Sequence, residues 1–309
     1  MQTRYAVISD VHGNLPALQA VIADAERRGA NAYLLLGDYI VDFPWPNEVA
    51  ETLRSLRNAT IIRGNKEERL LNARVWRGNE QMAATEWTYR ELTPENLTYY
   101  SALPSSAEIT DDSGEKIRLF HNFKTLIREP RIEIFRSSLF HAQMGMSRFT
   151  IEDANLRYRE AVLNRSDAMA EIAELPDGVY LWGHNHLQSK LEIDGKLLIN
   201  PGGCGVPLDF AGAAPYTLIE RTAERWKITQ LRVKYDVQAT VDALKASQFS
   251  KAAPVWVKLA EKSLLGGRDY FAPFRNYAHE LGLSRGEPDY PVSNETWRLA
   301  AATFDWDSL

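Results

Sequence analysis

The sequence is poor in cysteine and has no long apolar run. Its single cysteine, Cys204, cannot form an internal disulfide framework or a cysteine-rich zinc or iron–sulfur site. Such usage is typical of a reducing compartment, so we expect the protein in the cytoplasm. No apolar run approaches the roughly 20 residues that cross a bilayer, and the stretch 5–8 is too short for a signal core. We therefore expect no membrane partner.

An excess of positive charge is also missing. Lys and Arg total 36 against 41 Asp and Glu, which gives a formal net charge of −5, and there is no long basic run. Nucleic acid is therefore not an expected partner, and any polyanion must be met by local cations or metal ions. The hydrophobic fraction of 45% and the charged fraction of 25% are those of a folded globular protein.

The first part of the chain alternates between strand-like and helix-like segments. Three apolar runs are typical of buried strands: residues 4–9, 32–36 and 59–63. Apolar residues at helical spacing from Leu15 to Ala25 predict a helix after the first run, and Asn47 after Pro46 predicts a capped helix through about residue 57. This alternation indicates a parallel sheet with crossover helices.

The later segments change once from mostly predicted strands to predicted helices. Helices are predicted over 66–103, where Thr93 can cap a turn before Pro94, and over 151–175. Strands are predicted at 106–110, 116–120, 179–182, 188–193, 196–199, 216–220 and 226–233. After Tyr235 the pattern is helical, at 237–247, 254–265, 270–281 and 294–303. We therefore predict one domain over 1–234 and a helical C-terminal extension over 235–309.

Polar side chains follow the predicted strands at the point where each strand ends. They are Asp10, His12, Asp38, Asn65, His121, His184 and His186. In an open α/β sheet, ligands bind beyond the carboxyl ends of the strands, so we expect these residues on one rim. Four of the six histidines are among them. Oxygen and nitrogen ligands without thiolate favour divalent Mn, Fe, Zn, Ni or Mg.

A pair of such ions would need a shared carboxylate. Asp38 is the candidate at a central strand end. Two ions about 3.5–4 Å apart hold both the attacking and the leaving oxygen of an in-line phosphoryl displacement. The rim therefore predicts phosphoryl chemistry.

The order of these residues resembles the motif series of the calcineurin-like metallophosphoesterases. The matching motifs are Asp10-x-His12, Gly37-Asp38, Gly64-Asn65-x-Glu67, His121 and Gly183-His184-x-His186. The resemblance spans roughly residues 4–233. Four further stretches are similar to a prokaryotic branch described as diadenosine tetraphosphatase-like or phosphodiesterase-like: 37–48, 87–104, 200–203 and 234–237.

This resemblance implies a fold, a metal centre and a reaction. The fold is a four-layer α/β/β/α sandwich, in which residues 1–234 form the catalytic domain. Carried over by motif position, Asp10, His12 and His186 hold one divalent ion. Asn65, His121 and His184 hold a second, and Asp38 bridges the two. A metal-bound hydroxide then attacks phosphorus, and no protein nucleophile is needed.

The implied substrate is a small phosphodiester or phosphoanhydride, with nucleotides such as dinucleoside polyphosphates among the candidates. The predicted catalytic residues are Asp38, Asn65, Lys66 and His121. Lys66 stands where many members have histidine. A lysine has a reference pKa of about 10.4 and is a poor proton donor near neutrality, but it can offset charge on phosphoryl oxygens.

Substrate contacts are predicted for Arg63, Lys66 and His141, with alternatives. Arg63 fits phosphate contact and a surface role equally, and His141 is more often structural. His121 is preferred over His141 as a metal ligand because it ends a clean apolar run. Aromatic residues of the extension fit a core, a subunit contact, or a cap over the site that stacks on a nucleobase.

Other functions remain open at this stage. A phosphomonoesterase acting on a phosphoprotein or a small phosphate has the same motif series, and a non-catalytic scaffold can share the fold. A nuclease is disfavoured by the missing basic run. The sequence leaves a homo-oligomer open.

Overall fold

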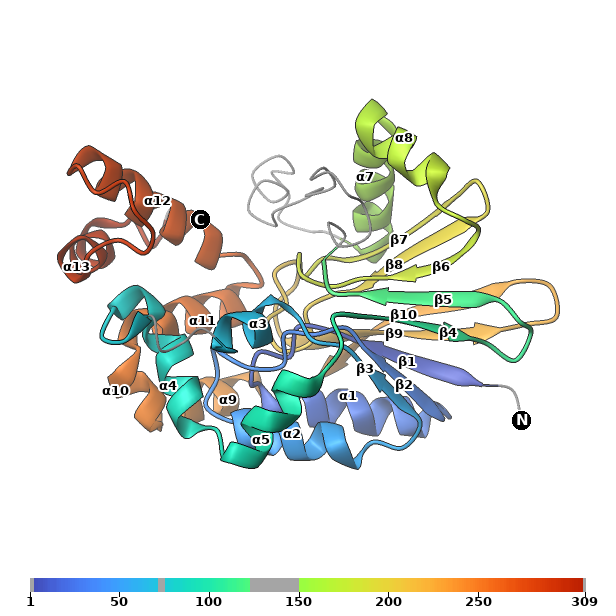
Figure 1. The fold of residues 1–309 in the computed structure, drawn as a ribbon, viewed down its shortest axis with the longest axis horizontal. Helices are drawn as coiled ribbons and strands as arrows, with labels where there is room; N and C mark the ends of the chain where they lie inside the picture. Colours follow the sequence, from blue (N-terminus) through green and yellow to red (C-terminus); the bar gives the residue numbers. More distant parts are fainter. Residues whose placement is uncertain (1–2, 72–75, 123–149, 308–309) are drawn as a thin grey trace.

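The computed structural model describes residues 3–71, 76–122 and 150–307, and within them two five-stranded sheets lie face to face (Figure 1). The first sheet has the order β10-β9-β1-β2-β3 and the second has the order β4-β5-β6-β8-β7. Helices cover the outer face of each sheet. The predicted four-layer α/β/β/α architecture is confirmed.

The first sheet joins three parallel strands to an antiparallel pair. Its strands are β1 (Arg4–Ile8), β2 (Ala32–Leu35), β3 (Ala59–Ile61), β9 (Ala213–Arg221) and β10 (Trp226–Lys234). β1, β2 and β3 pair in parallel, as the alternating pattern predicted, with Val7 opposite Leu34. β9 then pairs antiparallel to β1, with Val7 opposite Thr217. The strand ends of β1 and β2 therefore lie side by side in the middle of the sheet.

The second sheet is mixed in the same way. Its strands are β4 (Ser106–Thr110), β5 (Lys116–Phe120), β6 (Gly178–Leu181), β7 (Gln188–Ile193) and β8 (Lys196–Pro201). β4 and β5 form the predicted antiparallel hairpin, and β5, β6 and β8 run in parallel. His121 and the segment from Gly183 to His186 follow the adjacent strands β5 and β6.

Three buried clusters correspond to the interfaces between the four layers. Strand side chains alternate between the two faces of a sheet. Val7 and Leu34 point into the cluster between the sheets, where Leu119 and Leu181 meet them. The neighbouring Ile8 points to the helices outside the first sheet. Alternate residues of a strand therefore contribute to two different apolar clusters, one between the sheets and one under the helices.

The helices occupy three places. Outside the first sheet lie α1 (Leu15–Arg27), α2 (Pro46–Ser55) and α5 (Pro94–Ala102), and outside the second lie α7 (Ile151–Leu163) and α8 (Ser166–Glu174) (Figure 1). Beyond the strand ends follow α3 (Asn65–Leu71), the 3₁₀ turn η2 (Glu80–Met82) and α4 (Ala83–Glu91). No helix in the described ranges is long and apolar enough to cross a membrane.

The C-terminal part is helical, as predicted. It consists of α9 (Val237–Ala246), α10 (Gln248–Ala252), α11 (Pro254–Gly266), α12 (Phe271–Ser284) and α13 (Asn294–Thr303). The short α10 was not predicted. Phe274 on α12 is fully buried among Trp297, Phe304 and Trp306, with ring centroids 4.9–5.4 Å away. The boundary between residues 234 and 235 stays a prediction, because one apolar cluster continues across it.

One predicted cap is wrong. The helix α2 begins at Pro46, with Trp45 rather than Asn47 at the N-cap position. Proline has the backbone φ of a first helical residue, so the helix starts two residues earlier than predicted. The Asn47 side chain instead donates to the Glu91 carbonyl at 2.9 Å and accepts from the Thr93 N–H at 3.0 Å. Asn47 therefore joins α2 to the start of α5, where the predicted Thr93 cap is confirmed.

Candidate metal centre

The backbone is strained at five of the residues that follow the strands. Asp10, His12 and Asp38 each have φ of 54°, and His184 and His186 have φ of 73° and 61°. A left-handed conformation costs a residue other than glycine about 1–3 kcal/mol and persists only where the surroundings enforce it. Here Asp10 N–H donates to the Gly37 carbonyl at 3.0 Å, and His12 N–H donates to the Asp38 carbonyl at 2.9 Å. Such strain clusters at functional sites.

One group of candidate ligands consists of Asp10, His12 and His186. One ligand atom from each lies within 4.8 Å of the others, and all three residues are buried. Asp10 Oδ1 lies 3.4 Å from His186 Nε2 and 3.8 Å from His12 Nε2. The two Nε2 atoms are 3.2 Å apart. Three donor atoms therefore surround one small space.

The other ring nitrogens fix the tautomers of this group. His186 Nδ1 lies 2.6 Å from the Val206 carbonyl, which can only accept, so Nδ1 carries the hydrogen. His12 Nδ1 lies 2.7 Å from Asp42 Oδ2, and an ionised carboxylate likewise favours the hydrogen on Nδ1. In the neutral rings both Nε2 atoms then present lone pairs to each other. A cation between them, either a proton or a metal ion, would remove this repulsion.

A second group consists of Asp38, His121 and His184, again within 4.8 Å. His121 Nδ1 donates to the Leu36 carbonyl at 2.8 Å. Its Nε2 lone pair faces two acceptors, Asn65 Oδ1 at 3.1 Å and Asp38 Oδ2 at 3.3 Å. In the neutral ring no hydrogen lies between these converging lone pairs, so the arrangement fits a bound proton or metal ion here too.

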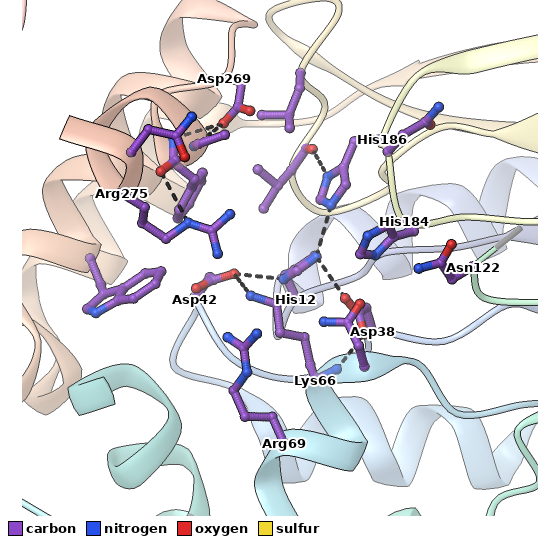
Figure 2. Close-up of a pocket in the computed structure, with 18 of the residues that line it drawn as sticks. His12, Asp38, Asp42, Lys66, Arg69, Asn122, His184, His186, Asp269 and Arg275 are labelled. Carbon is purple, nitrogen blue, oxygen red and sulfur yellow. Dashed lines mark hydrogen bonds and ion pairs between the residues drawn. The ribbon is translucent and has the colours of Figure 1, made fainter. Parts of the chain in front are cut away.

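Asp38, a member of the second group, also lies close to the first. Its Oδ2 atom is 3.3 Å from His121 Nε2 and 3.9 Å from His12 Nε2. Figure 2 shows Asp38 below the imidazole of His12, with His184 and His186 on the other side. The structure therefore brings together all seven side chains predicted as metal ligands, and the position of Asp38 fits the predicted bridge.

The electrostatics of both groups favour bound positive charge. Burial alone would lower the pKa of His12, but the neighbouring carboxylates of Asp10 and Asp42 outweigh it and raise the pKa to about 9. The pKa of His121 is likewise raised to about 10, chiefly by the charge of Asp38. Despite burial, the pKa values of Asp10 and Asp38 lie well below their ordinary value because histidines surround them.

His184 behaves differently from these neighbours. Burial and the charge of His121 lower its pKa to about 4. Its imidazole is therefore neutral at physiological pH, with a lone pair available to a metal ion. The two groups thus combine ionised carboxylates with imidazoles that can bind a divalent cation.

Glu67 and two glycines hold the ligand loops in place. The buried Glu67 carboxylate accepts from the N–H groups of Asp38, Tyr39 and Gly64 at 2.7–3.0 Å. Burial and the charge of Asp38 raise its pKa to about 7. A Cβ at Gly64 would lie 2.3 Å from Asp38 Oδ1, and one at Gly183 would lie 2.7 Å from Asp10 Oδ2. Only glycine leaves these carboxylates where they are.

Both ligand groups open into a cavity of about 580 Å³. Lys66 lines it, with its ammonium 3.4 Å from Asp42 Oδ2. Arg63 does not line it: its guanidinium lies 3.5 Å from Glu68 and 3.4 Å from the Leu103 carbonyl, which favours the surface role over phosphate contact. His141, the remaining predicted substrate contact, lies outside the described residues.

The sequence did not single out several residues of the cavity wall. Asp42 is buried and was recognisable only as a carboxylate within the apolar segment 39–43. Arg69 from α3 and Arg275 and His279 from α12 also line the cavity. Neither arginine belongs to a motif, so no local signal could have found them.

Comparison with known proteins identifies the family. The sequence profile of the calcineurin-like phosphoesterases matches residues 3–188, more than half of the chain. The chain belongs to the calcineurin-like phosphoesterase family. The C-terminal helices lie outside the matched residues.

Individual relatives cover more of the chain. It is 26% identical over 289 residues to the uncharacterized protein MJ0912 of Methanocaldococcus jannaschii, covering 86% of this chain and 99% of that one. The crystal structure of a metallophosphoesterase from Sphaerobacter thermophilus has a TM-score of 0.59 at 24% identity and covers 85% of this chain and 99% of that one. The hypothetical protein PH1004 from Pyrococcus horikoshii has the same TM-score at 19% identity, with 84% and 97% coverage. These two structures share the fold.

Proposed function

We propose that this chain is a dinuclear metal-dependent phosphoesterase that hydrolyses a small phosphodiester or phosphoanhydride. The observation that carries the proposal is the convergence of imidazole and carboxylate lone pairs in two adjacent groups with Asp38 between them. Family membership supports phosphoester hydrolysis as the reaction class. The donor set fits divalent Mn, Fe, Zn, Ni or Mg.

In this proposal the residues of the chain hold ions and orient the phosphoryl group. When bound, two such ions polarise the phosphoryl oxygens and lower the pKa of a bound water. Asp42 fixes the hydrogen of His12 on Nδ1, so that Nε2 is free to bind an ion. Lys66 places a positive charge at the cavity wall, where it can offset charge that develops on the phosphoryl oxygens.

Replacing the shared carboxylate tests the proposal directly. In Asp38→Ala, hydrolysis of bis(p-nitrophenyl) phosphate with added Mn²⁺ should fall by a factor of about 10³ or more, because the ions supply several kcal/mol of transition-state stabilisation. Asp242→Ala removes an exposed carboxylate on α9 and should keep wild-type turnover. Turnover by Asp38→Ala equal to that of wild type would refute the bridging role.

The same assay separates the substrate classes. p-Nitrophenyl phosphate is the monoester counterpart, and the proposal expects a higher kcat/KM for the diester with the same ion. A preference for the monoester would assign the chain to the phosphomonoesterases instead. Protein that neither retains nor rebinds metal ions, measured by elemental analysis, would favour a scaffold.

A further inference from the structure

We propose that Arg69 and Arg275 form an anion subsite of the metal cavity, which binds a second phosphoryl group of the substrate. This inference rests on the proposed function and narrows it to substrates with a chain of phosphoryl groups. Arg69 comes from α3, inside the residues that match the family profile, whereas Arg275 comes from α12, outside them. Both line the cavity that holds the two ligand groups.

The two guanidinium groups have no carboxylate partner among the described residues. Arg69 makes no hydrogen bond or ion pair there, and Arg275 only donates from Nε to the Phe271 carbonyl of its own helix at 3.3 Å. Among the described residues, the third lysine or arginine that lines the cavity is Lys66, and it lies 3.4 Å from Asp42 Oδ2. Both arginine side chains are half-buried. Partly buried guanidinium groups that face a cavity without an anion are suited to a ligand anion.

Their placement separates the subsite from the metal ligands. Figure 2 shows the guanidinium groups of Arg69 and Arg275 reaching toward the Asp42 side of the cavity from different helices. His184 and Asn122 lie across the cavity from them. Asp42 stands between the arginines and the imidazole of His12. An anion bound by the two arginines is therefore a different group from the phosphoryl group at the metal centre.

The chemistry of the wall selects phosphoryl over carboxylate chains. Each guanidinium carries five N–H donors. Arg275 Nε already donates to the Phe271 carbonyl, so the pair offers up to nine N–H donors to a ligand. A phosphoryl group has more acceptor oxygens than a carboxylate and takes bidentate contacts from arginine. Trp256 and Phe271 line the same cavity, with ring centroids 6.0 Å apart, and give it an apolar surface against which an organic substituent can lie.

A binding experiment tests the subsite independently of turnover. The protein is loaded with Mn²⁺, freed of excess metal and titrated calorimetrically with orthophosphate and with linear tripolyphosphate. Its metal content is measured again afterwards. Wild type should bind tripolyphosphate more tightly, and Arg275→Ala should weaken that binding about tenfold or more, as expected for lost charge-assisted hydrogen bonds. Orthophosphate binding should change less than twofold.

Two variants complete the test. Arg69→Ala should reproduce the selective loss. Arg268→Ala removes the same charge from the segment before α12 at an exposed position outside the cavity and should bind both anions like wild type. Equal binding of the two anions by wild type would overturn the subsite, as would a parallel loss of both in Arg275→Ala. A selective loss in a protein that hydrolyses no ester would support the subsite and refute the phosphoesterase proposal.

Discussion

The strand-end loops and the C-terminal helices line one cavity but are built differently. The loops present ionised carboxylates and imidazoles on a strained backbone, locked by hydrogen bonds such as that from His12 N–H to the Asp38 carbonyl. The helices α11 and α12 present arginine and aromatic side chains on relaxed helical backbone, held by ring packing around Phe274. The loops lie within the residues that match the family profile, and these helices do not. If the proposed functions hold, reaction chemistry depends on the loops and substrate choice on the helices, and each could change without the other.

The largest effect that separates the two regions is expected in the aromatic cluster. Phe274→Ala should lower the free energy of unfolding by about 3–5 kcal/mol, because a fully buried ring is lost and a cavity remains. Denaturant unfolding measures this, and Leu283→Ala, at a side chain 52% exposed on the same helix, is the control with little effect.

The Mn²⁺ affinity of Phe274→Ala shows whether the metal centre depends on the packing of the C-terminal helices. If the metal centre is held by the sheets alone, Phe274→Ala should still bind Mn²⁺ with wild-type affinity under native conditions. A parallel loss of Mn²⁺ affinity would show that the strand-end loops and the C-terminal helices form a single cooperative unit.

A smaller effect is expected at the carboxylate that supports His12. Asp42→Asn keeps the shape of the side chain but removes the charge that lies 2.7 Å from His12 Nδ1. Partners of this kind typically contribute ten- to hundredfold to metal affinity or activity, so a loss of about that size is expected in Mn²⁺ titrations.

Asp269→Asn is the matched change on the helical side of the cavity. Its Oδ1 accepts from the Phe271 N–H at 2.8 Å, a contact that an amide oxygen can keep. Metal affinity should stay at the wild-type level. Equal losses in both variants would mean that general cavity charge, rather than the orientation of His12, sets the affinity.

The smallest effect concerns the loop between α12 and α13. Glu287 accepts from the Ser293 N–H at 3.0 Å and from the Thr296 hydroxyl at 2.7 Å, and these bonds lower its pKa below 4.5. A lowered folded-state pKa stabilises the protein fully above 4.5 and progressively less as the pH falls through the folded value.

The Tm of wild type should therefore fall more steeply between pH 6 and pH 3 than that of Glu287→Gln, which has no carboxylate to protonate. The difference should be smaller than either of these effects, because the Glu287 side chain is partly exposed to solvent, which screens its charge. Identical pH profiles would show that the contacts of Glu287 add nothing to the stability of the helical wall.

The sequence predicted the metal rim better than the cavity wall, for a physical reason. Asp10, Asp38 and His121 each follow an apolar run that must be a strand, and parallel strands bring their carboxyl ends to one edge. Their convergence follows from local pattern plus one topological rule. Arg69 and Arg275 meet only because α12 packs over the strand ends, and no local pattern encodes that packing.

Other features that the sequence did not predict also depend on contacts between residues far apart in the chain. Asn47 follows the rule for helix caps, yet its amide found partners in Glu91 and Thr93, far along the chain. The antiparallel pairing of β9 with β1 was not predicted because strand order depends on long-range contacts. His279 on α12 is an ordinary helix residue by local pattern and lines the cavity only through tertiary packing.

Each candidate ligand group draws on both sheets, and this decides when the centre can exist. His12 follows a strand of the first sheet and His186 a strand of the second, 174 positions later. Asp38 and His121 are divided between the sheets in the same way. During synthesis on the ribosome, ion uptake must wait until both halves of the sandwich have been made and have docked. An ion bound there would be coordinated by both sheets and would stabilise the interface between them. Its removal would then destabilise that interface.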